Sequence, residues 1–185
     1  MRSTPRTIDW SQLDWRAFQR LVNRLLFVMG ERRIENSHLR RSLPFAALGK
    51  DFQIDGLYEG QLCGAGGKWL VQCKFSVNPN VSPARVRQWL SNKEIAKYAA
   101  RARSLGADHL LVATNWEVNH QTYSDTVARI RQAGIEGELW SAEELNNYLA
   151  LVVSPRSAFT IHGLGRDPLA RGRTSALPRG RRGRL

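Results

Sequence analysis

Several features that define common protein classes are scarce in this sequence. Its 185 residues include two cysteines, Cys63 and Cys73, which are too few for a disulfide framework or a cysteine-based zinc cluster. The apolar runs are short, Leu25 to Met29 being typical of the longest, and none reaches the roughly 18–20 residues needed to cross a bilayer. The basic N-terminus is not followed by an apolar stretch, which disfavours a secretory signal. These absences predict a cytoplasmic protein without a membrane-spanning segment.

Motifs of several enzyme classes are also missing. The sequence has no Walker lysine loop, no dinucleotide-binding glycine pattern and no nucleophile elbow. None of the four histidines has a metal-ligand spacing to another: His38, His109, His120 and His162. We therefore expect no histidine-based metal site, and the histidines are interpreted as structural or exposed.

Acidic residues are few relative to basic ones. The chain has 28 Lys and Arg against 16 Asp and Glu, a formal charge of +12, while 42% of its residues are hydrophobic. A core of ordinary size is therefore expected. Such an excess of positive charge is usually neutralised by a polyanion, which predicts nucleic acid as the first partner and a membrane surface as the second.

Half of the net positive charge lies at the C-terminal end. Residues 165–185 hold seven arginines, four glycines and two prolines, but a single acid, Asp167. Because so few apolar residues cannot form a core, we expect residues 161–185 to be a flexible, Arg/Gly-rich cationic tail. The tail binds phosphate without sequence preference or serves as a solubilising segment or linker. Residues 1–160 are predicted to form one domain.

Helix and strand patterns alternate along that domain. Ser11 and Asp14 resemble a capping box before an amphipathic helix that we expect to end at Gly30. We expect a hairpin from strands at 52–59 and 68–76, a helix from Ser82 to Leu105, a strand at 109–114, a helix at 121–133, a strand at 135–140 and a helix from a Ser141/Glu144 capping box to Leu149. This order predicts an α/β domain with a central mixed sheet flanked by helices.

The second strand of the hairpin carries polar residues inside an apolar run. Alternation places Trp69, Val71, Cys73 and Phe75 on a core face, with Gln72 and Lys74 on the other face. Such polar groups are costly to bury without partners, and Asp55 on the first strand can supply one. A carboxylate and an amide oxygen can hold Mg²⁺, and a lysine beside them can stabilise charge on a phosphodiester.

This region resembles the Mrr-like restriction endonucleases of the PD-(D/E)xK nuclease superfamily. The resemblance rests on Phe18-Gln19 in the first helix, on the Gly49–Asp55 segment, on Gln72-Cys-Lys74, and on a strand that ends near Thr114-Asn115. It covers most of residues 10–150, and these features occur in the family's order. Three positions depart from the more usual family pattern, since Gln19 and Gln72 replace acids and Gln53 replaces a glycine.

The resemblance implies a restriction-endonuclease-like fold and a metal-dependent DNA endonuclease of a restriction or defence type. Asp55 and Gln72 are then the ligands of Mg²⁺ or Mn²⁺, Lys74 orients or activates water, and Gln19 points at the site from the first helix. With two amides in place of acids, a single weakly held metal ion is favoured over two. Asp51 is interpreted as structural.

Two other readings of the same residues stay open. A weakened nuclease fold could act as a DNA-binding or assembly module, which the two glutamines favour, and a junction-resolvase-like enzyme is a close variant of the nuclease. Double-stranded DNA is the expected partner, with RNA not excluded, and a homodimer or a separate sensor protein could complete the system. Trp116 is a candidate for base stacking, and the Arg32-Arg33 and Arg40-Arg41 pairs are candidates for a phosphate-contacting rim.

Overall fold

The computed structural model describes residues 8–42 and 54–152. Asp51, Gln53 and the predicted tail at 161–185 lie outside these ranges. A five-stranded sheet runs through the described part in the order β1 (His38–Arg41), β2 (Gly56–Leu62), β3 (Ala65–Lys74), β4 (His109–Thr114) and β5 (Glu136–Trp140). The first three strands are antiparallel, and β3, β4 and β5 are parallel. The predicted mixed sheet is therefore confirmed.

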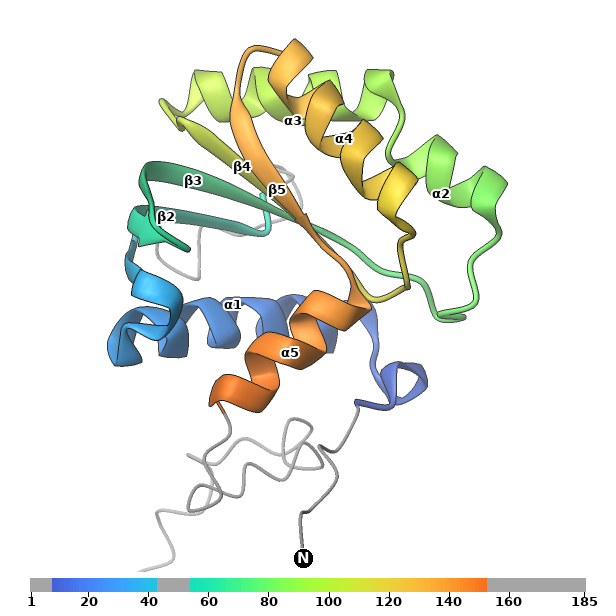
Figure 1. Cartoon of the computed structure of the whole chain (residues 1–185), viewed down its shortest axis with the longest axis horizontal. Coiled ribbons are helices and arrows are strands. Elements are labelled where there is room, and N and C mark those ends of the chain that lie inside the picture. The colour runs from blue at the N-terminus through green and yellow to red at the C-terminus, as the bar shows by residue number, and fades with distance from the viewer. Residues whose placement is uncertain (1–7, 43–53, 153–185) are drawn as a thin grey trace, which may run out of the picture.

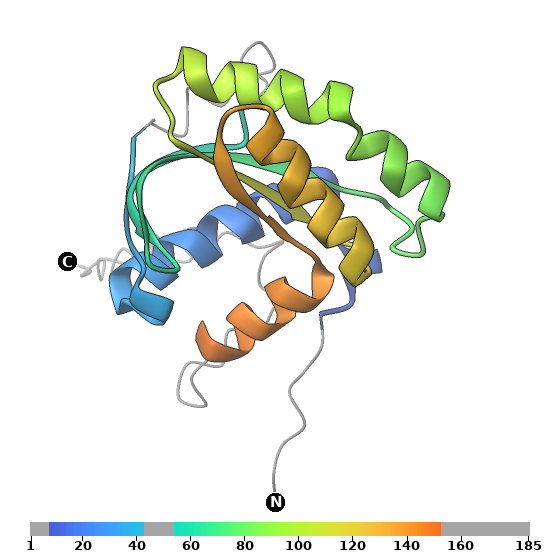
Figure 2. The same ribbon diagram turned by 45° about the horizontal axis from the view of Figure 1, so that its top comes forward.

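Helices cover both faces of this sheet. One face carries α1 (Trp15–Arg32) and α5 (Ala142–Val152), and the other carries α2 (Pro83–Trp89), α3 (Asn92–Ser104) and α4 (His120–Gln132) (Figure 1). Short 3-10 turns at Trp10–Gln12 and Ile34–Asn36 flank α1. The connections β3–α2–α3–β4 and β4–α4–β5 are the helical crossovers that parallel strands require, and the turned view shows α3 and α4 lying over the same face (Figure 2). Within the described ranges, no helix has the length and apolarity needed to span a bilayer.

The predicted alternation along β3 is confirmed. Trp69, Val71 and Cys73 belong to the core cluster beneath α1 and α5, whereas Leu70 belongs to the cluster beneath α2, α3 and α4. The strand is buried on both faces because it lies in the centre of the sheet. Gln72 and Lys74 therefore extend toward the α2–α3 layer, at the end of β3.

The structure corrects both ends of the first helix. Asp14 is itself the N-cap, since its carboxylate accepts a hydrogen bond from the Ala17 backbone N–H at 2.6 Å, so the predicted Ser11 capping box is wrong. The helix also continues through Gly30 to Arg32. Gly30 packs against β1, where an added Cβ would lie 2.9 Å from the Leu39 backbone nitrogen. This glycine permits a close helix–strand contact and does not end the helix.

The helix expected from Ser82 to Leu105 is two helices. Leu90 lies between α2 and α3 and is fully buried, and Ser91 caps α3 by accepting a hydrogen bond from the Glu94 backbone N–H. The prediction took Ser82 and Pro83 as the start and Gly106 as the end of one helix, and it missed the cap at Ser91. Strand β1 was also not predicted, because its sequence His-Leu-Arg-Arg shows no alternation of apolar and polar residues. In the structure its residues are alternately exposed and partly buried.

Two tryptophan and arginine predictions change as well. Trp116 is 1% exposed and packs on Trp89 with ring centroids 5.0 Å apart, so it is a core residue and not a base-stacking one. Trp15, at the start of α1, is 41% exposed. Arg32 and Arg33 lie at the end of α1 that is opposite to Trp15, and Arg32 donates a hydrogen bond to the Val152 carbonyl. This pair is therefore at the far end of the helix from Gln19.

Candidate functional site

Asp55 lies at the point where β2 begins. Its backbone N–H donates to the Val71 carbonyl at 3.3 Å, one residue before the first ladder pair of Gly56 and Val71. Its side chain then turns toward β3, where Oδ2 accepts from the Cys73 backbone N–H at 2.6 Å. The carboxylate thus takes the place of a strand carbonyl at the end of the ladder and is held in the plane of the sheet.

Two glutamines reach this carboxylate from opposite layers. Gln72 Nε2 donates to Asp55 Oδ2 at 2.5 Å, and Gln19 Nε2 donates to Oδ1 at 2.9 Å. Asn23, one turn after Gln19 on α1, donates to the Asp55 backbone carbonyl and accepts from the Tyr58 hydroxyl. The structure therefore brings together Asp55, Gln72 and Gln19, as the sequence predicted. Asn23 was missed because its role depends on the tertiary contact between α1 and β2.

Burial controls the charge of Asp55. The residue is 5% exposed, and this loss of hydration raises its pKa from 3.8 to about 6. The Cys73 N–H, the positive charge of Lys74 and the Gln72 amide oppose that shift and lower the pKa. The carboxylate is anionic near neutral pH but costly to keep so. A bound cation would relieve that cost.

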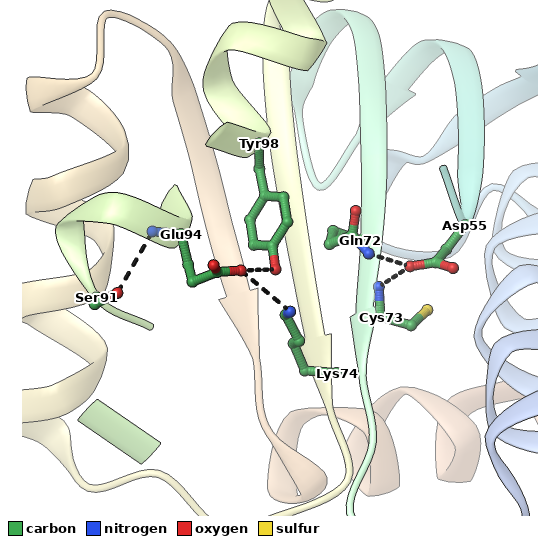
Figure 3. A network of polar contacts seen from close by, with 7 residues as sticks. All are labelled: Asp55, Gln72, Cys73, Lys74, Ser91, Glu94 and Tyr98. Carbon is green, nitrogen blue, oxygen red and sulfur yellow. Dashed lines mark hydrogen bonds and ion pairs between the residues drawn. The ribbon is translucent and has the colours of Figure 1, made fainter. Parts of the chain in front are cut away.

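Lys74 is held by residues of α3. Its ammonium lies 3.6 Å from the Glu94 carboxylate and 4.8 Å from the centroid of the Tyr98 ring, and the Tyr98 hydroxyl donates to Glu94 at 2.8 Å (Figure 3). Burial lowers the pKa of Lys74, and the negative charge of Glu94 raises it again. Glu94 was not predicted as a site residue, although Ser91-x-x-Glu94 has the spacing of a capping box and could have indicated a helix start here.

A pocket joins these groups. It has a volume of about 430 Å³ and lies where the start of α1 faces α2 and α3 across the end of β3. Its lining combines aromatic rings with both signs of charge: Trp15, Asp55, Gln72, Cys73, Lys74, Phe75, Trp89, Glu94, Lys97 and Tyr98. Only two of these residues carry carboxylates, Asp55 on one side and Glu94 on the side of α3.

Two residues of this pocket, Asp55 and Gln72, carry oxygen atoms of the type that bind a divalent cation. Within residues 8–42 and 54–152, no three His, Cys, Asp or Glu side chains form a metal-binding group. However, Gln72 Oε1 is buried without a hydrogen-bond partner, while Nε2 of the same amide faces the Asp55 carboxylate. A buried oxygen without a partner is unfavourable, and a cation is one partner that would satisfy it. Mg²⁺ commonly takes only one or two protein ligands and completes its shell with water and substrate phosphate.

Comparison with protein-family models, with curated proteins and with solved structures gives no match for this chain.

Proposed function

We propose that the protein is a metal-dependent endonuclease that hydrolyses phosphodiester bonds of DNA, in the manner of the Mrr-like enzymes it resembles. The observation that carries this proposal is the Asp55–Gln72–Lys74 set at the end of β3, with one buried carboxylate, one amide oxygen without a partner and one cation on a common pocket. The resemblance also implies a restriction-endonuclease-like fold, with which a mixed sheet between helical layers agrees.

The metal site is the first part of the mechanism. Asp55 and Gln72 Oε1 would hold Mg²⁺ or Mn²⁺, and Gln19 and the Cys73 N–H would fix the orientation of the carboxylate. A bound divalent ion lowers the pKa of a coordinated water and neutralises charge on the scissile phosphate. In this structure Nε2 is the atom of the Gln72 amide that faces Asp55. The amide must therefore turn over so that Oε1 faces the metal site.

Lys74 supplies the second part. Its ammonium can donate hydrogen bonds to the attacking water or to a phosphate oxygen, where negative charge develops as water attacks phosphorus and the bond to one sugar oxygen breaks. Glu94 and Tyr98 contact Lys74 and would hold its ammonium in place, which is a positioning role. The ammonium must move out of its contact with Glu94, or share it, to reach the phosphate.

Plasmid cleavage with Mg²⁺ or Mn²⁺ tests this proposal. We expect the wild type to nick or cut, and Asp55→Asn and Lys74→Gln each to lose activity by two or more orders of magnitude, as is typical for removal of a group that stabilises the transition state. Lys68→Gln is the matched control, since Lys68 lies on the same face of β3 but contacts the Leu105 carbonyl. Cleavage that survives Lys74→Gln would place the active site elsewhere.

A second function is favoured by one feature of the same site. Both carboxylate oxygens of Asp55 accept hydrogen bonds, and Lys74 is paired with Glu94. A site whose groups satisfy one another in this way suits a nuclease fold retained as a DNA-binding or assembly module. Salt-sensitive DNA binding without cleavage in either metal, unchanged by Asp55→Asn, would support this alternative.

A further inference from the structure

Charge is distributed unevenly over the described part of the fold. Residues 105–152, which form β4, α4, β5 and α5, contain seven acids and two arginines, a formal charge of −5. Residues 54–104 contain eight lysines and arginines against three acids, a formal charge of +5. Residues 8–42 contribute a further +3. The positive charge therefore belongs to the two stretches that supply the lining of the pocket, and the negative charge to residues 105–152, which supply none of it.

Two rows of cations concentrate this charge on helix surfaces. One row lies on α1, at Arg16, Arg20 and Arg24, and the other lies on α3, at Lys93, Lys97 and Arg101. Residues four apart share a helix face, so each row covers about 12 Å of its helix. That length corresponds to three or four nucleotides of a DNA strand, at about 3.4 Å each.

Each row includes residues that line the pocket or directly follow or precede residues of the site in the sequence. Arg16 follows Trp15, which lines the pocket, and Arg20 follows Gln19, which binds Asp55. Lys97 lines the pocket directly, and Lys93 precedes Glu94. The two helices lie in opposite layers of the domain, on the two sides of the sheet (Figure 1).

Four of these side chains are exposed and form no ion pair within 4.0 Å among the described residues. They are Arg16, Arg20, Lys93 and Lys97. In this part of the chain, the ion pairs within 4.0 Å are Lys74–Glu94 and Arg131–Glu136. Cations in such rows repel one another, and a polyanion that lies along the row removes the repulsion.

We propose that these two cationic rows bind the sugar–phosphate backbone of duplex DNA on either side of the pocket, without reading base sequence. This inference rests on the proposed nucleic-acid substrate and assigns the surface that holds it. Flexible cations on exposed helix faces contact phosphates and position the duplex, whereas base recognition needs side chains that enter a groove. The acidic stretch at residues 105–152 contributes no residue to the lining of the pocket.

The test is salt-dependent binding of a short, labelled duplex by the full chain in EDTA, so that no cleavage occurs. Two variants each remove two charges from one row: Arg16→Gln/Arg20→Gln and Lys93→Gln/Lys97→Gln. The matched control, Arg33→Gln/Arg131→Gln, removes two exposed charges away from the pocket. Each lost phosphate contact reduces the slope of log Kobs against log salt by about 0.9, so we expect each row variant to lose up to about 1.8 and the control to lose nothing.

Equal slopes in the row variants, the control and the wild type would overturn the proposal. Binding of anionic phosphatidylserine vesicles, lost in the same row variants, without any binding of duplex DNA, would overturn it as well. Because the assay contains no metal, its result is independent of cleavage. If the row variants lower the salt slope but the wild type never cleaves DNA, the nuclease proposal is refuted and the binding surface is supported. If the wild type cleaves DNA but the row variants leave the slope unchanged, the binding surface is refuted and the nuclease proposal is supported.

Discussion

At the scale of single residues, Glu94 influences both the pKa and the position of the Lys74 ammonium. Burial lowers the pKa of the half-buried Lys74, and the negative charge of the Glu94 carboxylate raises it. The same contact holds the ammonium on the α3 side of the pocket (Figure 3). A cation that is buried beside a phosphate-binding site needs such a partner when the substrate is absent.

Replacing Glu94 by Gln should therefore shift the pH dependence of cleavage. The variant keeps an acceptor for the Tyr98 hydroxyl but loses the negative charge that raises the pKa of Lys74. If the ammonium form is the active one, the rate falls as pH rises through the pKa of Lys74, and in Glu94→Gln this fall begins at lower pH. The measurement is the initial rate of plasmid cleavage across the alkaline range.

The control is Glu59→Gln, which removes an exposed carboxylate of β2 on the same sheet. We expect its pH profile to match that of the wild type. Identical alkaline limbs in Glu94→Gln and the wild type would show that Glu94 does not tune Lys74.

At the scale of elements, the position of α1 depends on one close contact. Gly30 faces the backbone of Leu39 in β1, and Gln19, three turns earlier on the same helix, faces Asp55. A straight helix transmits any displacement along its length, so the contact at Gly30 affects the distance between α1 and the sheet. This is how a residue far from the pocket can affect the orientation of the Asp55 carboxylate.

Gly30→Ala should be destabilising in spite of the better helix propensity of alanine. The added Cβ would lie 2.9 Å from the Leu39 nitrogen and 3.0 Å from its carbonyl oxygen, both of which belong to a paired strand and cannot easily move. Overpacking of this kind costs about 1–3 kcal/mol, which exceeds the propensity gain of about 1 kcal/mol. Urea unfolding measures the change, and Glu31→Ala on the exposed side of α1 is the control. A Gly30→Ala protein as stable as the control would mean that α1 can shift freely.

Sequence patterns predicted most elements, and they failed where tertiary contacts decide. The strands at β3, β4 and β5 and the burial on both sides of β3 follow from apolar runs and alternation. The break at Leu90 does not, because a buried leucine fits either one helix or two, and only the cap at Ser91 separates them.

Some residues of the candidate site could likewise be predicted from the sequence, and others depend on tertiary contacts. Asp55, Gln72, Lys74 and Gln19 could be predicted because they share a strand face, a hairpin or a family pattern. Glu94 could not, since its partner Lys74 is 20 residues away and the two meet only after α3 packs on the sheet. The prediction for Asp51 concerns a residue outside the described ranges.

At the scale of the whole molecule, the site should lower the stability of the folded protein near neutral pH. The pKa of Asp55 is raised from 3.8 to about 6 by burial, so the folded protein binds this proton more tightly than the unfolded chain. Its contribution to stability is fully present below about pH 4 and is lost as pH rises through about 6. A shift of this size corresponds to about 3 kcal/mol, and Asp55 is almost fully buried.

Urea unfolding at a series of pH values, with and without millimolar Mg²⁺, measures this contribution. We expect the free energy of unfolding of the wild type to fall between about pH 4 and 6 relative to Asp55→Asn, which has no carboxyl to titrate. At higher pH, Mg²⁺ should recover part of the loss in the wild type, because a ligand that binds only the folded state stabilises it by mass action. Asp55→Asn should show no such recovery. If the free energy of unfolding changes with pH in the same way in the two proteins, the pKa of Asp55 is not raised in the folded state. If the stability of the wild type falls with pH as expected but does not respond to Mg²⁺ or Mn²⁺, the metal site is refuted and the raised pKa of the buried carboxylate is supported. The binding-module function requires this outcome.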